Sequence, residues 1–112
     1  MRFTLLFLPT LYFSSLLHAV EGSHYYQQHC AACHGQHGER KAWSVTKPIA
    51  EWTPEAVKQA LVGYKDNNRD RYGYGAYMHP QISKYSQEEI DAIAEYVSSL
   101  GHARKQLVSN SH

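Results

Sequence analysis

Apolar residues recur with a helical period in two stretches of the chain. The first stripe consists of Val57, Ala60, Leu61 and Tyr64, and the second of Ile90, Ile93, Ala94, Val97 and Leu100. Side chains three and four positions apart share one face of a helix, so each stripe predicts an amphipathic helix that packs against a core. Because no stretch has the pattern of alternating strands and helices, the chain is predicted to be all-α.

Start and stop signals flank these two stripes. Thr53 is placed to cap a helix whose first position is Pro54, and Ser86 with Glu89 has the spacing of a capping box. Gly101 follows the second stripe, where a glycine commonly ends a helix. We therefore expect the last helix to stop there, before a polar C-terminal tail.

A further helix is expected before these two, with Ser23 as its cap and Gly35 as its break. Residues 36–52 mix basic side chains, two tryptophans and a proline, which predicts a loop. Residues 66–77 are rich in Asn, Asp, Arg, Gly and Tyr and predict a second loop. This second loop leads directly into Met78, which we expect to lie between helices.

The apolar run at the N-terminus has the features of a secretory signal peptide. Arg2 supplies a positive charge, residues 3–17 are mainly apolar, and Ala19 offers a small residue for cleavage. The run is shorter than the roughly 20 apolar residues that span a bilayer. We therefore expect export to the periplasm, with an uncleaved N-terminal anchor as the alternative.

The expected organisation is a signal peptide at 1–19, one domain at 20–101 and a polar tail at 102–112. The 112 residues carry 11 Lys or Arg against 10 Asp or Glu, and this balance gives no electrostatic support to nucleic-acid binding. No stable membrane insertion is expected after signal cleavage. A domain this small has a thin core and commonly needs a cofactor, a metal or a disulfide to fold.

The motif Cys30-Ala31-Ala32-Cys33-His34 carries the most specific chemistry in the chain. The pattern C-x-x-C-H is the attachment signature of a c-type haem. On a helix, its three functional side chains share one face. Two thiols can then form thioether bonds to the vinyl groups of one porphyrin while the imidazole of His34 binds the iron, so we expect one covalently bound haem.

Other interpretations of the two cysteines fit less well. A zinc site would need histidines to complete four ligands, and the candidates are His24, His29, His34 and His37. A thioredoxin-type redox pair needs a preceding strand, which the pattern does not provide. A structural disulfide between Cys30 and Cys33 would close a very small loop and add little stability.

Met78 is the candidate ligand for the other side of the iron. The chain has two methionines, and Met1 would leave with the signal peptide. A methionine thioether is the usual partner of histidine in haem proteins that carry electrons. The alternatives are that Met78 fills a gap in the core, or that His79 binds the iron in its place.

The order of these features resembles class I cytochrome c, in particular the short monohaem forms of bacteria. The matching pieces are the motif at 30–34, Gly63-Tyr64-Lys65, Met78 and the terminal helix pattern, and the resemblance spans nearly all of residues 22–101. It implies a small all-α fold of three to five helices packed around one haem. It also implies that the first and last helices cross near that haem.

The resemblance extends to the surroundings of the iron. It implies His34 and Met78 as axial ligands, with a hydrogen bond from the His34 imidazole to the carbonyl of Pro48. Aromatic residues are candidates to pack against the porphyrin, namely Trp43, Trp52, Tyr64 and Tyr96. Arg69 and Arg71 could pair with a haem propionate, although a solvated loop is the simpler interpretation.

Taken together, these features predict a periplasmic electron carrier and not an enzyme. The protein would be a monomer that exchanges single electrons with membrane-bound or periplasmic redox proteins of a respiratory chain. A haem enzyme or gas-binding sensor is the alternative, and it would need a labile sixth ligand and a distal acid or base, for which His79 is the nearby candidate. A zinc-binding module is a further alternative.

Overall fold

Helices and loops make up the part of the chain that the computed structural model describes, which is residues 21–42 and 46–111. Residues 21–29 are helical, and they are followed by α2 (Ala31–His34), α3 (Pro54–Lys65), α4 (Gly75–Ile82) and α5 (Gln87–Asn110). No strand occurs among these residues, so the all-α prediction is confirmed. The predicted signal peptide at 1–19 and Trp43 lie outside the described residues.

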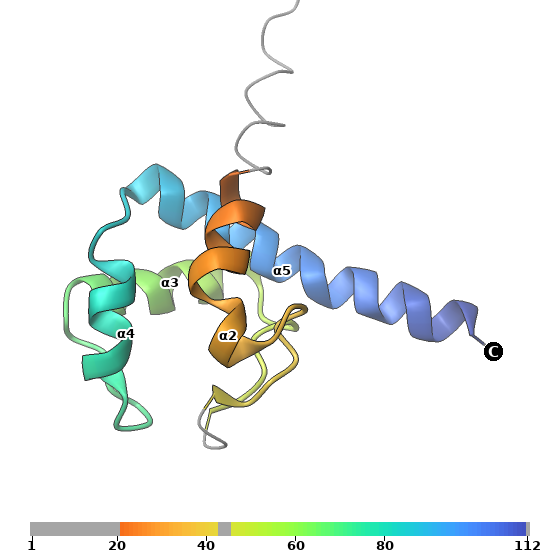
Figure 1. The fold of residues 1–112 in the computed structure, drawn as a ribbon, viewed down its shortest axis with the longest axis horizontal. Coiled ribbons are helices and arrows are strands. Elements are labelled where there is room, and N and C mark those ends of the chain that lie inside the picture. The colour runs from red at the N-terminus through yellow and green to blue at the C-terminus, as the bar shows by residue number, and fades with distance from the viewer. Residues whose placement is uncertain (1–20, 43–45, 112) are drawn as a thin grey trace, which may run out of the picture.

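The N-terminal helix crosses α5 at close range, as Figure 1 shows. A Cβ atom on Gly22 would overlap the carbonyl oxygen of Ala92, so only a glycine lets the two backbones approach this far. One turn later, the rings of Tyr26 and Tyr96 pack with their centroids 5.5 Å apart. The crossing of the first and last helices that the resemblance implied is therefore present.

Both predicted helix starts are confirmed by their capping hydrogen bonds. The Thr53 hydroxyl accepts from the Ala56 backbone N–H at 3.2 Å. The Ser86 hydroxyl accepts from the Glu89 N–H at 3.2 Å, and the Glu89 carboxylate accepts from the Ser86 N–H at 3.0 Å. These bonds satisfy amide donors that the first turn of a helix leaves without partners.

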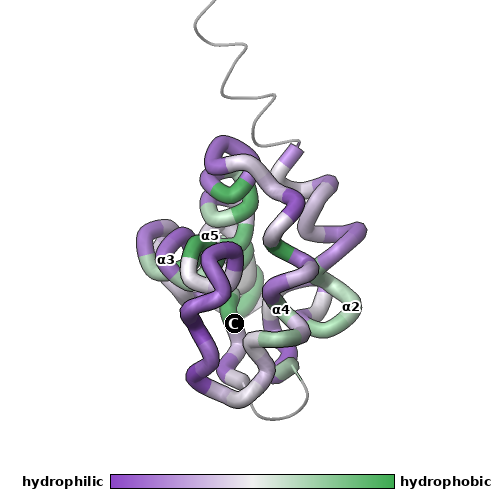
Figure 2. Tube along the Cα trace, turned by 90° about the vertical axis from the view of Figure 1, so that its left-hand side faces the viewer, coloured by the Kyte–Doolittle hydropathy of each residue, from purple (hydrophilic) through white to green (hydrophobic). Residues whose placement is uncertain are grey.

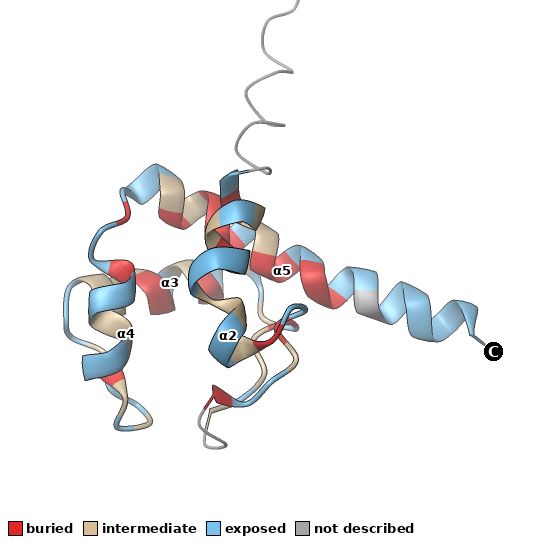
Figure 3. Cartoon of the chain, viewed as in Figure 1, coloured by how far each residue is buried: buried red, intermediate tan, exposed pale blue. Residues whose placement is uncertain are grey.

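The predicted end of the last helix at Gly101 is wrong, because α5 continues to Asn110. Gly101 is buried inside the helix, and a Cβ atom there would overlap the carbonyl oxygen of Ala50. The glycine therefore permits close contact between α5 and the loop around Ala50. Beyond it the described side chains are exposed, and Figure 3 shows the end of α5 projecting from the body.

Two further expectations about local structure are also wrong. Ser23 does not cap the first helix, since the chain is already helical at residue 21. Met78 does not lie in a loop but near the middle of α4. The helix was missed because it is short, its cap residue Tyr74 makes no side-chain capping bond and it contains Pro80. The usual start signals are therefore absent, and a helix breaker is present.

The core lies where α3, α4, α5 and the N-terminal helix meet. Its most completely buried side chains are Tyr26, Ile82, Ile90, Ile93 and Val97. Both apolar stripes contribute to this core, and Figure 2 shows apolar and hydrophilic stretches succeeding one another along the chain. Among the described residues, no helix is long and apolar enough to cross a bilayer.

Candidate functional site

A cavity of about 390 Å³ lies between the Cys30–His34 segment, α3, α4 and the loop at 46–52. This volume falls within the usual range for small-molecule and cofactor sites. Its walls are largely apolar, with Val57, Ala60 and Leu61 from α3 and Ile82 from α4. The cavity therefore offers the apolar surround that a porphyrin needs.

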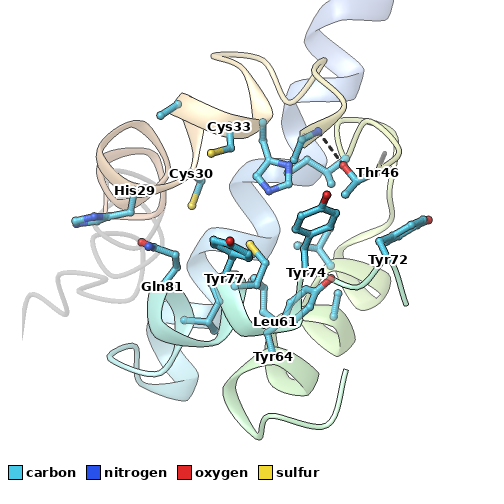
Figure 4. A pocket seen from close by; sticks show the side chains of 18 of the residues that line it. His29, Cys30, Cys33, Thr46, Leu61, Tyr64, Tyr72, Tyr74, Tyr77 and Gln81 are labelled. Carbon is cyan, nitrogen blue, oxygen red and sulfur yellow. Dashed lines mark hydrogen bonds between the residues drawn. The ribbon is translucent and has the colours of Figure 1, made fainter. Parts of the chain in front are cut away.

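All three functional side chains of the motif line this cavity, namely Cys30, Cys33 and His34. A turn brings them together, since the His34 backbone N–H donates to the Cys30 carbonyl at 3.0 Å. Figure 4 shows the Cys30 and Cys33 sulfurs on the same side of the cavity. Both cysteines are free thiols, so the structure does not contain the alternative disulfide.

The environment of Cys30 disfavours redox chemistry by the thiol itself. Burial raises the pKa of Cys30 to about 11, and the nearby Cys33 adds to the increase, while Lys84 opposes it. The thiolate is the nucleophile in disulfide exchange, and a thiol with so high a pKa is almost entirely protonated at neutral pH. A structural bond to a cofactor suits this thiol better than thioredoxin-type exchange does.

His34 has the state that a metal ligand requires. Burial lowers the pKa of its imidazole, so the ring is neutral near pH 7, and a neutral ring is the form that binds metals. Its Nδ1 atom is buried and has no hydrogen-bond partner among the described residues. The bond to the Pro48 carbonyl that the resemblance implied is therefore not formed, and Pro48 does not line this cavity.

Met78 and His79 point to different surroundings. Met78 is half-buried and lines the cavity from α4. His79 is not among the lining residues, and its Nδ1 lies 2.8 Å from the carbonyl oxygen of Tyr64. Of the two candidate donors, the methionine is thus the one that shares the cavity with His34.

The aromatic predictions are partly right. Trp52 and Tyr64 line the cavity, whereas Tyr96 does not and packs on Tyr26 instead. Sequence reasoning missed three further tyrosines of the wall, which are Tyr72, Tyr74 and Tyr77 (Figure 4). The available signal was the abundance of tyrosine in residues 66–77, but this segment was interpreted only as a loop.

Neither predicted arginine lines the cavity. The Arg69 guanidinium lies 5.6 Å from the ring centroid of Tyr64, where a cation–π contact is favourable, and Arg71 is exposed. Pairing of either arginine with a propionate therefore stays a prediction. The zinc alternative also lacks a ligand set, since no three His, Cys, Asp or Glu side chains converge on one point within the described residues.

Comparison with known proteins agrees with this geometry. The family model for cytochrome c matches residues 19–101. The chain is 31% identical to a cytochrome c-553 of Nitratidesulfovibrio vulgaris (strain DSM 19637 / Miyazaki F) over 86 residues, covering 73% of this chain and 78% of the relative. It is also 31% identical to a cytochrome c-553 of Helicobacter pylori (strain J99 / ATCC 700824) over 71 residues, covering 63% and 70% of the two chains.

The family match covers most of the chain, and it coincides with a C-x-x-C-H motif at the edge of an apolar cavity. The chain belongs to the cytochrome c family as a short class I monohaem member, an electron carrier with a c-type haem and not an enzyme.

Proposed function

We propose that this protein is a periplasmic single-electron carrier whose one haem is attached through Cys30 and Cys33 and bound axially by His34 and Met78. The observation that carries the proposal is that all four side chains line one cavity. They come from separate elements, the thiols and imidazole from the motif segment and the thioether from α4.

The surrounding residues support a role in holding the iron without transforming a substrate. The haem supplies an iron that changes its oxidation state by one electron, and a methionine ligand raises its potential. His34 presents a neutral imidazole. Val57, Leu61 and Ile82 are buried apolar walls that exclude water from the site, which disfavours the more highly charged ferric state.

The rim of the cavity supports electron exchange with partner proteins. Cys33, Tyr77 and Gln81 line the cavity and are also exposed, so the cavity opens to the surface at these residues. An electron can enter or leave there without passage through the core. The partners proposed are membrane-bound or periplasmic redox proteins of a respiratory chain, which the protein meets as a monomer.

The proposed location rests on residues 1–19, whose charge and apolar pattern are typical of a signal peptide. Covalent haem attachment normally takes place outside the cytoplasm, which agrees with export. Cell fractionation with haem staining tests this proposal. We expect a haem-stained protein of the cleaved mass in the periplasmic fraction, and a full-length protein in the membrane fraction would instead indicate the uncleaved anchor.

The ligand assignment is tested by the visible spectrum of the ferric protein. We expect the weak charge-transfer band of methionine ligation, and we expect Met78→Ala to abolish it. Ser83→Ala is the matched control, because Ser83 is exposed and directly follows α4 without lining the cavity. Survival of the band in Met78→Ala would overturn the assignment.

The covalent attachment is tested separately by replacing the cysteines. Covalent haem should be lost completely only when Cys30 and Cys33 are both replaced, since either thiol alone can hold the haem by one bond.

A further inference from the structure

We propose that His79 is a positioning residue for Met78, because its imidazole ties α4 to the end of α3 and so keeps the methionine at the cavity. The inference rests on the proposed ligand role of Met78. It concerns a residue that directly follows the ligand and that does not itself line the cavity.

The contact that carries the inference is the hydrogen bond between His79 and Tyr64. The His79 Nδ1 atom lies 2.8 Å from the Tyr64 carbonyl oxygen, and both residues are half-buried. A carbonyl oxygen only accepts, so Nδ1 carries the proton and donates. Tyr64 is the penultimate residue of α3, and its carbonyl also accepts from the Asn67 backbone N–H at 3.1 Å. His79 therefore adds a donor from α4 to a carbonyl at the helix end that the following turn already binds.

Helical geometry explains how one residue points to the cavity and the next to α3. Successive residues on an α-helix are rotated by about 100°. With Met78 directed at the cavity, His79 therefore faces a different neighbour, and that neighbour is the end of α3. The hydrogen bond consequently fixes the rotation of α4 about its own axis, which is the motion that would turn Met78 away.

The helix α4 depends on such attachments because it is weak by itself. It has eight residues, and isolated helices below about 12 residues are marginal in water. Its cap residue Tyr74 makes no side-chain capping bond, and Pro80 removes one backbone donor from the interior. The Asp70 carboxylate holds the first turn by accepting from the Gly75 N–H at 2.7 Å, and buried Ile82 holds the last.

His79 supplies the attachment between these two ends, next to Met78. The residue that receives it is also well held. The ring of Tyr64 forms part of the cavity wall under the Arg69 guanidinium, and the following Lys65 donates from Nζ to the Tyr85 carbonyl. The hydrogen bond between His79 and Tyr64, called the tether below, therefore links the helix that carries the methionine to a fixed part of the same cavity wall.

The test compares His79→Ala with His79→Asn in the haem-loaded protein. Alanine removes the donor, whereas the asparagine amide nitrogen occupies nearly the place of Nδ1 and can donate. His102→Ala is the matched control, since His102 is exposed in the projecting end of α5. Imidazole is titrated against the ferric protein, and its displacement of methionine is followed by loss of the charge-transfer band.

We expect His79→Ala to bind imidazole on the order of fivefold more tightly, because one lost hydrogen bond raises the population with methionine released by about that factor. His79→Asn should restore part of the difference, and His102→Ala should match the wild type. Hydrogen exchange of the amides in α4 should be fastest in His79→Ala, intermediate in His79→Asn and unchanged in His102→Ala. Unchanged imidazole affinity and unchanged exchange in His79→Ala would overturn the inference.

The proposed ligand and the proposed tether can fail separately. A wild-type protein without the methionine band would overturn the ligand assignment, while the tether would still be tested by proton NMR of the wild type. The tether requires a slowly exchanging Nδ1 proton on His79, and rapid exchange of that proton would refute it. Appearance of the methionine band only after His79→Ala would mean that His79 binds the iron, which contradicts both proposals.

Discussion

The phenol of Tyr26 donates a hydrogen bond to the carbonyl oxygen of Gly35 over 2.7 Å, from the helix before the haem motif to the residue directly after it. Tyr26 is fully buried, with 0% of its surface exposed, and desolvation by burial raises the pKa of its phenol. The bond closes residues 26–35 into one unit. The two thiols and the imidazole of the motif are therefore held within a segment that is fastened at both ends.

Replacing Tyr26 with phenylalanine should destabilise the protein by about 0.5 to 1.5 kcal/mol, because the Gly35 carbonyl loses its side-chain donor while the ring packing remains. The carbonyl keeps the Gly38 backbone N–H as a second donor at 3.3 Å. Urea denaturation, monitored by circular dichroism, measures the free energy of unfolding. Tyr25→Phe is the matched control, since Tyr25 is only half-buried and its phenol pairs with the Glu89 side chain instead of with a buried carbonyl. Equal losses for the two variants would show that the Gly35 bond has no special weight.

Gly101→Ala should lower the melting temperature although alanine is the better helix former. In an exposed helix this change would stabilise by up to about 1 kcal/mol. Here the new Cβ would overlap the carbonyl oxygen of Ala50, and such overpacking costs about 1 to 3 kcal/mol. Ser109→Ala, at an exposed position of the same helix, should be neutral or slightly stabilising. A gain in stability for Gly101→Ala would contradict the close contact.

A chain that ends after His102 should keep its stability within about 0.5 kcal/mol and its haem spectrum unchanged, because the described side chains beyond Gly101 are exposed. Ending the chain after Ser98 instead removes buried Leu100 and Gly101 and should cost several kcal/mol. Thermal unfolding of both truncated proteins checks the difference. A large loss from the shorter deletion would mean that the end of α5 packs on something in solution.

The capping box of α5 predicts a dependence of stability on acid pH. The backbone hydrogen bond from Ser86 is the main cause that lowers the pKa of Glu89 below its ordinary value of 4.5. A carboxyl whose folded-state pKa is lowered stabilises the fold above its unfolded pKa, and this contribution is lost as the pH falls through the folded value. The contribution is therefore complete above about pH 5 and disappears at more acidic pH.

Glu89→Gln should reduce the loss of stability at acid pH, because glutamine can accept the same hydrogen bond without titrating. Urea unfolding between pH 6 and about pH 3 measures the slope. Glu95→Gln is the matched control on the same helix, where the glutamate is exposed. If both variants retain the wild-type slope, Glu89 does not contribute to the acid sensitivity.

The sequence predicts best those structural features that depend on residues close together in the chain. Thr53 and Ser86 mark helix starts correctly because capping is local chemistry, and the stripes in α3 and α5 predict buried faces because burial follows the helical period. Gly101 was misread because a glycine needed for close tertiary contact looks the same in sequence as one that ends a helix.

The site is predictable where it depends on residues that are adjacent in the chain. The parts that the sequence did not predict depend on tertiary contacts. The thiols and imidazole of the motif are adjacent in sequence, so their convergence on one cavity could be foreseen. The orientation of His79 depends on Tyr64, fifteen residues earlier, and no local pattern encodes that pairing. The position of Tyr96 on Tyr26, away from the cavity, likewise depends on how the two helices cross.

The projecting end of α5 makes the protein suitable for oriented attachment to an electrode. The chain contains two cysteines, and both would be consumed by bonds to the haem. A cysteine introduced at Leu107, which is 72% exposed, would then be the single reactive thiol. Leu107 lies near the end of α5, the same helix that crosses the N-terminal helix (Figure 1). Coupling that thiol to a gold electrode would attach every molecule in the same orientation. The measured current would then report electron transfer along one route from the haem to the electrode.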